Sequence, residues 1–276
     1  MNRYMHGYTD REAERLRDQC SILEQLLHST VSYPPGSAVL EAGCGVGAQT
    51  LALAKRSPQA DFTSIDISPD SLDRARALIE GEGITNVRFQ QADIMGLPFD
   101  DGSFDHVFVC FVLEHLGDPP AALGEMRRVL KPGGSITVIE GDHGSCFWHP
   151  ETAASRQAWQ AMIRVQQEMG HDPLIGRRLH PLLAQAGFDI DGITPLWAYA
   201  DAAMPQLLDG AVNKILAPMM ETAREEALAM GLIDRATWEQ GIADMHRAAM
   251  PPDGSVFYTW FRGVGTTRQQ TDNHAC

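Results

Sequence analysis

Three glycines stand close together between an apolar run at 37–41 and a helical pattern at 48–56. Gly43, Gly45 and Gly47 belong to the stretch EAGCGVG. Glycine allows tight turns with positive φ and lets a ligand approach the backbone without a Cβ in the way. Free amides at the start of the next helix can meet a carboxylate or a phosphate. The stretch therefore predicts a ligand-binding loop; the alternative is a turn that only packs the helix against the strand.

An acidic residue ends each of the next two predicted strands. Asp66 comes 23 residues after Gly43, where a carboxylate can accept both hydroxyls of a ribose. Its alternative role is to cap the helix that begins just after it. Asp93 ends the third strand, where it can accept from the amino group of adenine while Ile94 packs on the ring. Together these residues predict an adenosine-binding edge of a sheet.

Two classes of cofactor carry this adenosine. Gly43, Gly45 and Ala48 satisfy the dinucleotide pattern GxGxxA, which is typical of a nicotinamide-dependent oxidoreductase. S-adenosylmethionine (SAM) has the same ribose and adenine. The loop alone does not choose between them.

Two histidines follow the strands predicted at 104–112 and 135–140. Ligands of an open α/β sheet bind at the carboxyl ends of its strands, so His115 and His143 should face a bound substrate. His143 is the first candidate general base, because a neutral imidazole titrates near the working pH. The alternatives are a loop histidine bonded to backbone for His143 and a packing residue for His115. Glu114 and Glu140 are placed to orient either ring.

The elements that must position these residues alternate along the chain. Near-continuous apolar strands separated by helices imply a parallel sheet with helices on both faces. We predict an α/β fold, Rossmann-like and doubly wound, with seven mostly parallel strands. The strands are predicted at 37–41, 61–66, 86–90, 104–112, 135–140, 188–196 and 256–264.

The rest of the chain is predicted to be helical or irregular. Residues 1–35 form an N-terminal helical lid, and 36–200 form the core. A helical cap at 201–250, rich in Met and Ala, is inserted before the last core strand at 251–265. Residues 266–276 are polar and form a flexible tail.

Composition excludes several function classes. The net charge is −14, from 22 basic and 36 acidic residues, and such a surface repels nucleic acid. The five cysteines are widely spaced without a CxxC or Cys/His cluster, which favours reduced thiols in a cytoplasmic protein without a metal site. No signal core and no apolar run of membrane-spanning length occurs. We therefore expect a small-molecule substrate and no membrane span.

The order of motifs between 37 and 142 resembles that of a known family. The chain reads EAGCGVG…SID…ADIMGLPFDDGSFD…FVLEHLGDP…RVLKPGG. This string is similar to the class I SAM methyltransferases, and most similar to the ubiquinone and menaquinone biosynthesis type and its natural-product relatives. The resemblance implies SAM as cofactor and S-adenosylhomocysteine as product, and its LPFDDGSFD and LKPGG segments argue against a nicotinamide cofactor.

The resemblance also implies a role for each matching residue. The glycine loop cradles the methionine part of SAM, Asp66 holds the ribose, and adenine lies between Ile67 and the Asp93-Ile94 pair. The end of the fourth strand lines the site near the sulfonium, Gln49 offers a polar contact, and Tyr8 of the lid reaches over SAM. The full set of expected cofactor residues is Tyr8, Gly43, Cys44, Gly45, Gln49, Asp66, Ile67, Asp93, Ile94, Cys110, Phe111 and Val112.

Several alternatives stay open at this point. The acceptor atom can be carbon, oxygen, nitrogen or sulfur. The long helical insertion departs from the quinone-biosynthesis pattern, which favours a specialised metabolite over a quinone-like ring. The stretch 202–249 can cap the pocket or form the surface of a homo-oligomer. A SAM-binding regulatory or interaction module without transferase activity fits the same motifs.

Overall fold

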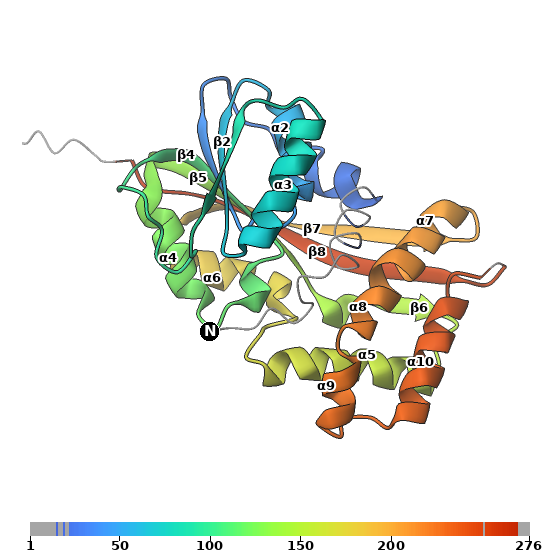
Figure 1. The fold of residues 1–276 in the computed structure, drawn as a ribbon. Helices are drawn as coiled ribbons and strands as arrows, with labels where there is room; N and C mark the ends of the chain where they lie inside the picture. The colour runs from blue at the N-terminus through green and yellow to red at the C-terminus, as the bar shows by residue number, and fades with distance from the viewer. Residues whose placement is uncertain (1–14, 16–18, 20–21, 251, 270–276) are drawn as a thin grey trace, which may run out of the picture.

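The computed structural model describes residue 15, residue 19, and residues 22–250 and 252–269 (Figure 1). Tyr8, most of the predicted lid and the end of the predicted tail lie outside the described residues. Within them, residues 22–28 are helical, and Leu23 and Leu27 of this stretch are buried in the core. No helix in this described part of the chain combines the length and the apolar character that crossing a bilayer requires.

The central sheet is α/β and doubly wound, as predicted. Five parallel strands lie in the order β3-β2-β1-β4-β5. These strands are β1 (Ala38–Ala42), β2 (Asp61–Asp66), β3 (Val87–Gln91), β4 (Phe104–Cys110) and β5 (Leu130–Gly141). Beyond β5, β8 (Ser255–Thr266) runs antiparallel, and β7 (Asp189–Asp201) pairs with its outer edge. The chain order reverses between β1 and β4, so ligands are expected at the carboxyl ends of these two strands.

Helices cover both faces of the sheet. Val39 and Leu40, adjacent in β1, are both fully buried but belong to two different core clusters. The first cluster also contains Leu53 of α2 (Ala48–Arg56), and the second contains Met126 of α4 (Pro119–Val129). Residues that alternate along a strand point to opposite faces, so both faces of β1 are packed. The remaining core helices are α3 (Pro69–Gly81) and α6 (Leu179–Gln185).

The sheet has eight strands, so the prediction of seven was wrong by one. The additional strand is β6 (Phe147–His149), which continues along the edge of β8 that β5 occupies. A strand of three residues is too short for its hydrophobic pattern to stand out in the sequence. The predicted strand 188–196 also extends to Asp201, because β7 pairs with β8 along its whole length.

The second half of the chain adds a group of helices around β6 and the far ends of β7 and β8 (Figure 1). The stretch 202–249 is helical, as predicted, but broken into several pieces. These are α7 (Pro205–Asp209), the π-helical η4 (Gly210–Leu216), α8 (Ala217–Glu221), α9 (Arg224–Ala229) and α10 (Arg235–Arg247). Of these, α8, α9 and α10 pack against α5 (Ala153–Glu168), and α10 packs so closely that a Cβ on its Gly241 would lie 2.6 Å from the carbonyl oxygen of Ala154. The division into core and cap stays a prediction.

Three short 3-10 turns complete the loops at the carboxyl edge of the sheet and beside it. They are η1 (Leu113–His115), η2 (His143–Ser145) and η3 (Ile175–Arg178). The first follows β4 and the second follows β5, so both lie at the edge where ligands bind in this architecture.

Candidate active site

The glycine loop between β1 and α2 is tightly packed at one glycine and open at the next. Gly43, Gly45 and Gly47 have φ values of +80°, +52° and +81°, in the region that favours glycine. A Cβ on Gly43 would lie 2.5 Å from Cγ2 of Val112, so that position admits no side chain. A Cβ on Gly45 would have no atom within 4 Å. The loop thus presents an open space at Gly45, shaped by backbone alone.

Asp66 holds this loop from the end of β2. One carboxylate oxygen accepts from the Gly45 amide at 2.8 Å, and the other accepts from the Ser68 amide at 2.9 Å. The helix cap is Ser68, whose hydroxyl accepts from the Ser71 amide, so the alternative role for Asp66 falls to its neighbour. Burial raises the pKa of Asp66, against the amide bonds that lower it. Each oxygen keeps a second lone pair for a ligand hydroxyl.

The predicted adenine residues lie at the same edge. In the register of β2 with β3, Asp66 stands opposite Gln91, two residues before Asp93. The Asp93 side chain is exposed and accepts from the Met95 amide at 2.9 Å. Ile94 is buried, whereas Ile67 is 53% exposed. An exposed isoleucine beside an exposed carboxylate leaves an apolar and a polar surface at the edge of the sheet.

The end of β4 joins this loop to a cavity. Phe111 has a φ of +58°. Within the described part of the chain, no other non-glycine residue has a positive φ. Its neighbour Val112 packs on Gly43, and Phe111 itself lines the cavity. Oε1 of Glu140 accepts from the amides of Val112 and Leu113 at 3.0 and 2.8 Å. The buried Glu140 carboxyl therefore fixes the turn that carries Phe111.

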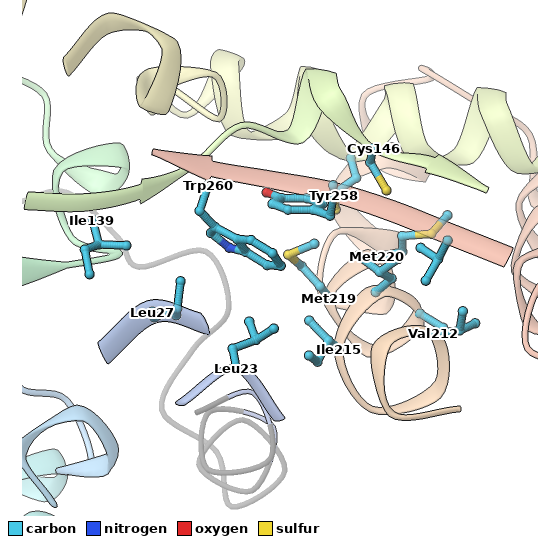
Figure 2. Close-up of a cluster of buried hydrophobic side chains, with 14 of the residues drawn as sticks. Leu23, Leu27, Ile139, Cys146, Val212, Ile215, Met219, Met220, Tyr258 and Trp260 are labelled. Carbon is cyan, nitrogen blue, oxygen red and sulfur yellow. The ribbon is translucent and has the colours of Figure 1, made fainter. Parts of the chain in front are cut away.

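The cavity lies against β7 and β8 and is bounded on another side by the helices α7, η4 and α8. Side chains from four parts of the chain line it. They are Arg15, Gln19 and Leu23 near the N-terminus, Phe111, Glu114, His115, Gly141 and His143 at the ends of β4 and β5, Ala198, Ala200, Val256, Tyr258 and Trp260 of β7 and β8, and Leu207, Ala211, Ile215, Leu216 and Met219 of the helical stretch. Figure 2 shows Leu23, Ile215, Met219, Tyr258 and Trp260 converging from these separate elements. Most of the lining is apolar.

The two predicted histidines meet around Glu114 at this cavity. Nε2 of His115 lies 3.5 Å from Oε1 of Glu114, and Nε2 of His143 lies 3.8 Å from Oε2. Nδ1 of His143 is 2.5 Å from the hydroxyl oxygen of Tyr258. Burial lowers the pKa of both histidines to about 3 and raises the pKa of Glu114 to about 7. At neutral pH both rings are therefore neutral.

Known protein families were compared with the sequence, and one of them matches the part of the chain that forms the glycine loop and the strand ends. The sequence matches the methyltransferase domain family over residues 40–138. That range contains the glycine loop, Asp66, Asp93 and the end of β4. Residues 40–138 therefore form a SAM-dependent methyltransferase domain.

The relatives of this chain differ in the share of the two sequences that can be aligned. It is 28% identical to an uncharacterised methyltransferase of Schizosaccharomyces pombe over 80% of this chain and 83% of that protein. It is 41% identical to demethylmenaquinone methyltransferase of Thermus thermophilus, over 37% of this chain and 46% of that protein. The chain spans about half the length of several curated relatives that it matches, the Thermus thermophilus enzyme among them.

A solved structure shares the fold of this methyltransferase. Geranyl diphosphate C-methyltransferase of Streptomyces coelicolor superposes with a TM-score of 0.54 at 16% identity, covering 93% of this chain and 82% of that one. The similarity extends beyond the sheet into the helices of the second half, since it covers nearly the whole chain.

Some residues of the methyltransferase have contacts that the sequence did not reveal. The side-chain oxygen of Gln49 pairs with a ring nitrogen of His28, which is fully buried, so Gln49 as a cofactor contact stays a prediction. Cys44 in the loop and Cys110 at the end of β4 are buried free thiols. Tyr8 lies outside the described residues, but Arg15 and Gln19 of the same N-terminal stretch line the cavity.

Glu41 is a buried carboxyl under the loop that sequence reasoning passed over. Its Oε2 accepts from the hydroxyls of Thr50 and Ser64 at 2.7 and 2.6 Å, and its Oε1 has no partner. Burial raises its pKa to about 7. Its place as the first residue of the glycine motif was the available signal. Glu41 thus ties β1, β2 and α2 together beneath the glycines.

Glu41→Gln is expected to change how stability depends on pH. A carboxyl whose folded pKa is raised stabilises the fold fully below its unfolded pKa near 4.5, and this contribution is lost as pH rises through about 7. Relative to the wild type, the variant should therefore gain stability between pH 5 and pH 8, by up to about 3 kcal/mol. Urea unfolding at several pH values measures the difference, and a difference that is constant with pH would contradict this assignment.

Proposed function

We propose that this protein transfers the methyl group of SAM to a small molecule bound in the cavity. The observation that carries the proposal is the junction at the end of β4. Val112 packs on the glycine loop, and the adjacent Phe111 lines the cavity, so a cofactor in the loop and an acceptor in the cavity would meet there. Such contact between two binding sites is what a direct transfer between bound molecules needs.

The residues at the loop fit SAM. The open space at Gly45 leaves room that a Cβ would fill, and Asp66 already orients its carboxylate through two amide bonds. We assign the methionine part to Gly43, Cys44 and Gly45, and the ribose to Asp66. The proposed contacts to the rest of the cofactor are Gln49, Ile67, Asp93, Ile94, Cys110, Phe111 and Val112, with Tyr8 from the N-terminus. When bound, SAM supplies an electrophilic methyl group on its sulfonium.

The remaining tasks belong to the side chains of the cavity. The apolar walls exclude water from the reacting atoms, and the walls together hold the acceptor in line with the methyl group. His143 and His115 are the histidines we propose for the acceptor side. Relatives in the family act, by their names, on demethylmenaquinone and on geranyl diphosphate, both of which have large apolar parts. We extend this to an acceptor with an apolar body, either a specialised metabolite or a quinone-like compound.

Asp66→Ala tests the cofactor assignment. The variant removes the carboxylate that we assign to the ribose hydroxyls, and a lost hydrogen bond to a buried partner costs about 1 kcal/mol or more, which is roughly a fivefold loss of affinity. Titration calorimetry with SAM measures it. Asp61→Ala, at the exposed opposite end of β2, is the matched control and should bind as the wild type does. Unchanged affinity in Asp66→Ala would refute the ribose assignment.

Methyl transfer itself is tested with SAM carrying a labelled methyl group. Incubation with a small-molecule cell extract should move the label into a low-molecular-weight product and release S-adenosylhomocysteine. Binding of SAM without any labelled product across such extracts would favour the alternative of a SAM-binding module without transferase activity.

A further inference from the structure

The cavity has a polar part and an apolar part that come from different elements. The polar side chains are Glu114, His115, His143 and Tyr258, at the ends of β4 and β5 and in β8. The apolar side chains come mainly from β7 and from the stretch α7–α8. Figure 2 shows Ile215 and Met219 of that stretch on the side of β8 that carries Tyr258 and Trp260. An occupant would therefore meet hydrogen-bonding groups over a small area and hydrocarbon over the rest.

One carboxylate oxygen of the polar part lacks a hydrogen-bond partner. Oε2 of Glu114 is buried and has no hydrogen bond, although the carboxyl lines the cavity. The side chain is 10% exposed. Nε2 of His143 lies 3.8 Å from this oxygen, which is beyond hydrogen-bond distance. Buried polar atoms in folded proteins are nearly always paired, so an unpaired oxygen on a residue that lines a cavity points to a ligand that donates a hydrogen bond to it.

His143, beside Glu114, is bonded to several neighbours. Nδ1 of His143 pairs with the hydroxyl of Tyr258, and its backbone amide donates to the Pro173 carbonyl at 2.9 Å. The Nε1 atom of Trp159 donates to the His143 carbonyl at 2.9 Å. These contacts hold the His143 ring in place beside Glu114. His143 is thus arranged as a positioning residue, and Glu114 has the free acceptor atom.

From this arrangement we infer that the acceptor carries one hydroxyl on an otherwise apolar body, and that Glu114 binds this hydroxyl and takes its proton. The inference rests on the proposed methyl transfer and names the substrate class for it. As the acceptor oxygen forms its bond to the methyl carbon, the methyl–sulfur bond breaks and leaves its electron pair on sulfur. The hydroxyl proton moves to the Glu114 carboxylate, which later releases it to water.

The charges around Glu114 suit a proton acceptor at neutral pH. Burial raises its pKa to about 7, Arg15 lowers it, and Asp172 raises it. A base works best when its pKa lies near the operating pH. The titratable and charged groups that face this carboxyl from the elements around it are Arg15, His115, Glu140, His143, His171, Asp172 and Tyr258.

The experiment compares small probes that differ either in a free hydroxyl group or in the length of an alkyl chain. Protein saturated with S-adenosylhomocysteine is titrated with 4-hexylphenol, with its methyl ether 4-hexylanisole, and with 4-ethylphenol. At pH 8 the phenol should bind at least tenfold more tightly than the ether, because only the phenol donates to the carboxylate. 4-Hexylphenol should bind at least tenfold more tightly than 4-ethylphenol, since each buried methylene raises the affinity roughly fourfold.

The pH dependence separates proton acceptance from a structural role. The preference for phenol over ether should fall as pH drops from 8 to 6, because the Glu114 carboxylate becomes protonated. In Glu114→Gln the preference should be at least threefold smaller and independent of pH. Glu114→Asp, which keeps a carboxylate, should retain the pH dependence. Glu168→Gln, an exposed carboxyl on α5, is the matched control and should behave as the wild type.

Each result decides the matter. Equal binding of phenol and ether overturns the inference, as does a preference that ignores pH or survives unchanged in Glu114→Gln. Failure of 4-hexylphenol to bind protein that still binds S-adenosylhomocysteine overturns it as well. If the wild-type protein does not bind S-adenosylhomocysteine at all, the proposed function itself is refuted. Circular dichroism and cofactor affinity of each variant confirm that it is folded.

Discussion

Gly45→Ala is expected to lower the affinity for SAM at least tenfold while the protein stays folded. No atom lies within 4 Å of the position that the new Cβ would take, so the methyl group would enter open space rather than the core. That space is where we place the methionine part of the cofactor. The backbone at φ +52° strains an alanine by about 1 kcal/mol, which a folded domain tolerates. Titration calorimetry measures the affinity, and thermal unfolding measures the stability.

Gly43→Ala, two residues away, is the matched variant with the opposite outcome. Its Cβ would lie 2.5 Å from the Val112 side chain, at φ +80°. Overpacking of about 1–3 kcal/mol and strain of about 1–2 kcal/mol add to a loss of about 2–5 kcal/mol in the free energy of unfolding. If Gly45→Ala bound SAM normally, or if both variants lost stability equally, the open space at Gly45 would not be the seat of the cofactor.

The sheet was predictable because its signal is local. Strands such as β1 and β4 are buried on both faces, so they stand out as apolar runs between turn residues. Helix starts are also local, since Ser68 before Pro69 and Asp118 before Pro119 each cap a helix with their own side chain. β6 was missed because three residues carry no period. The far end of β7 was missed because Trp197 and Tyr199 there are exposed and do not read as core.

The cofactor half of the site could be predicted from the sequence more fully than the acceptor half. The cofactor half is built from segments whose roles depend on nearby residues, and Asp66 bonds to Gly45 only 21 positions away. The acceptor half depends on contacts between distant segments. His143 meets Tyr258 across 115 positions. No pattern in the sequence indicates that Tyr258 bonds to His143, that Glu140 holds the end of β4, or that Oε2 of Glu114 has no hydrogen bond.

Trp159→Ala is expected to give the largest loss of stability among single changes near the acceptor side. Trp159 is 1% exposed. Its ring centroid lies 5.7 Å from that of Trp148 and 5.8 Å from that of His143. Removing a buried tryptophan side chain costs about 3–5 kcal/mol. Trp159→Phe keeps most of the burial but loses the hydrogen bond to the His143 carbonyl, so part of the loss should remain, at about 1 kcal/mol or more.

Trp197→Ala is the matched control for this change. Trp197 is 60% exposed on β7, so its removal should alter the free energy of unfolding by only about 0.5 kcal/mol. Urea unfolding of the three variants gives the comparison, and equal losses in Trp159→Ala and Trp197→Ala would contradict it. The reason for the difference is positional. Trp159 joins α5 to the turn after β5, so this one side chain stabilises both the helices of the second half and the ring of His143 beside Glu114.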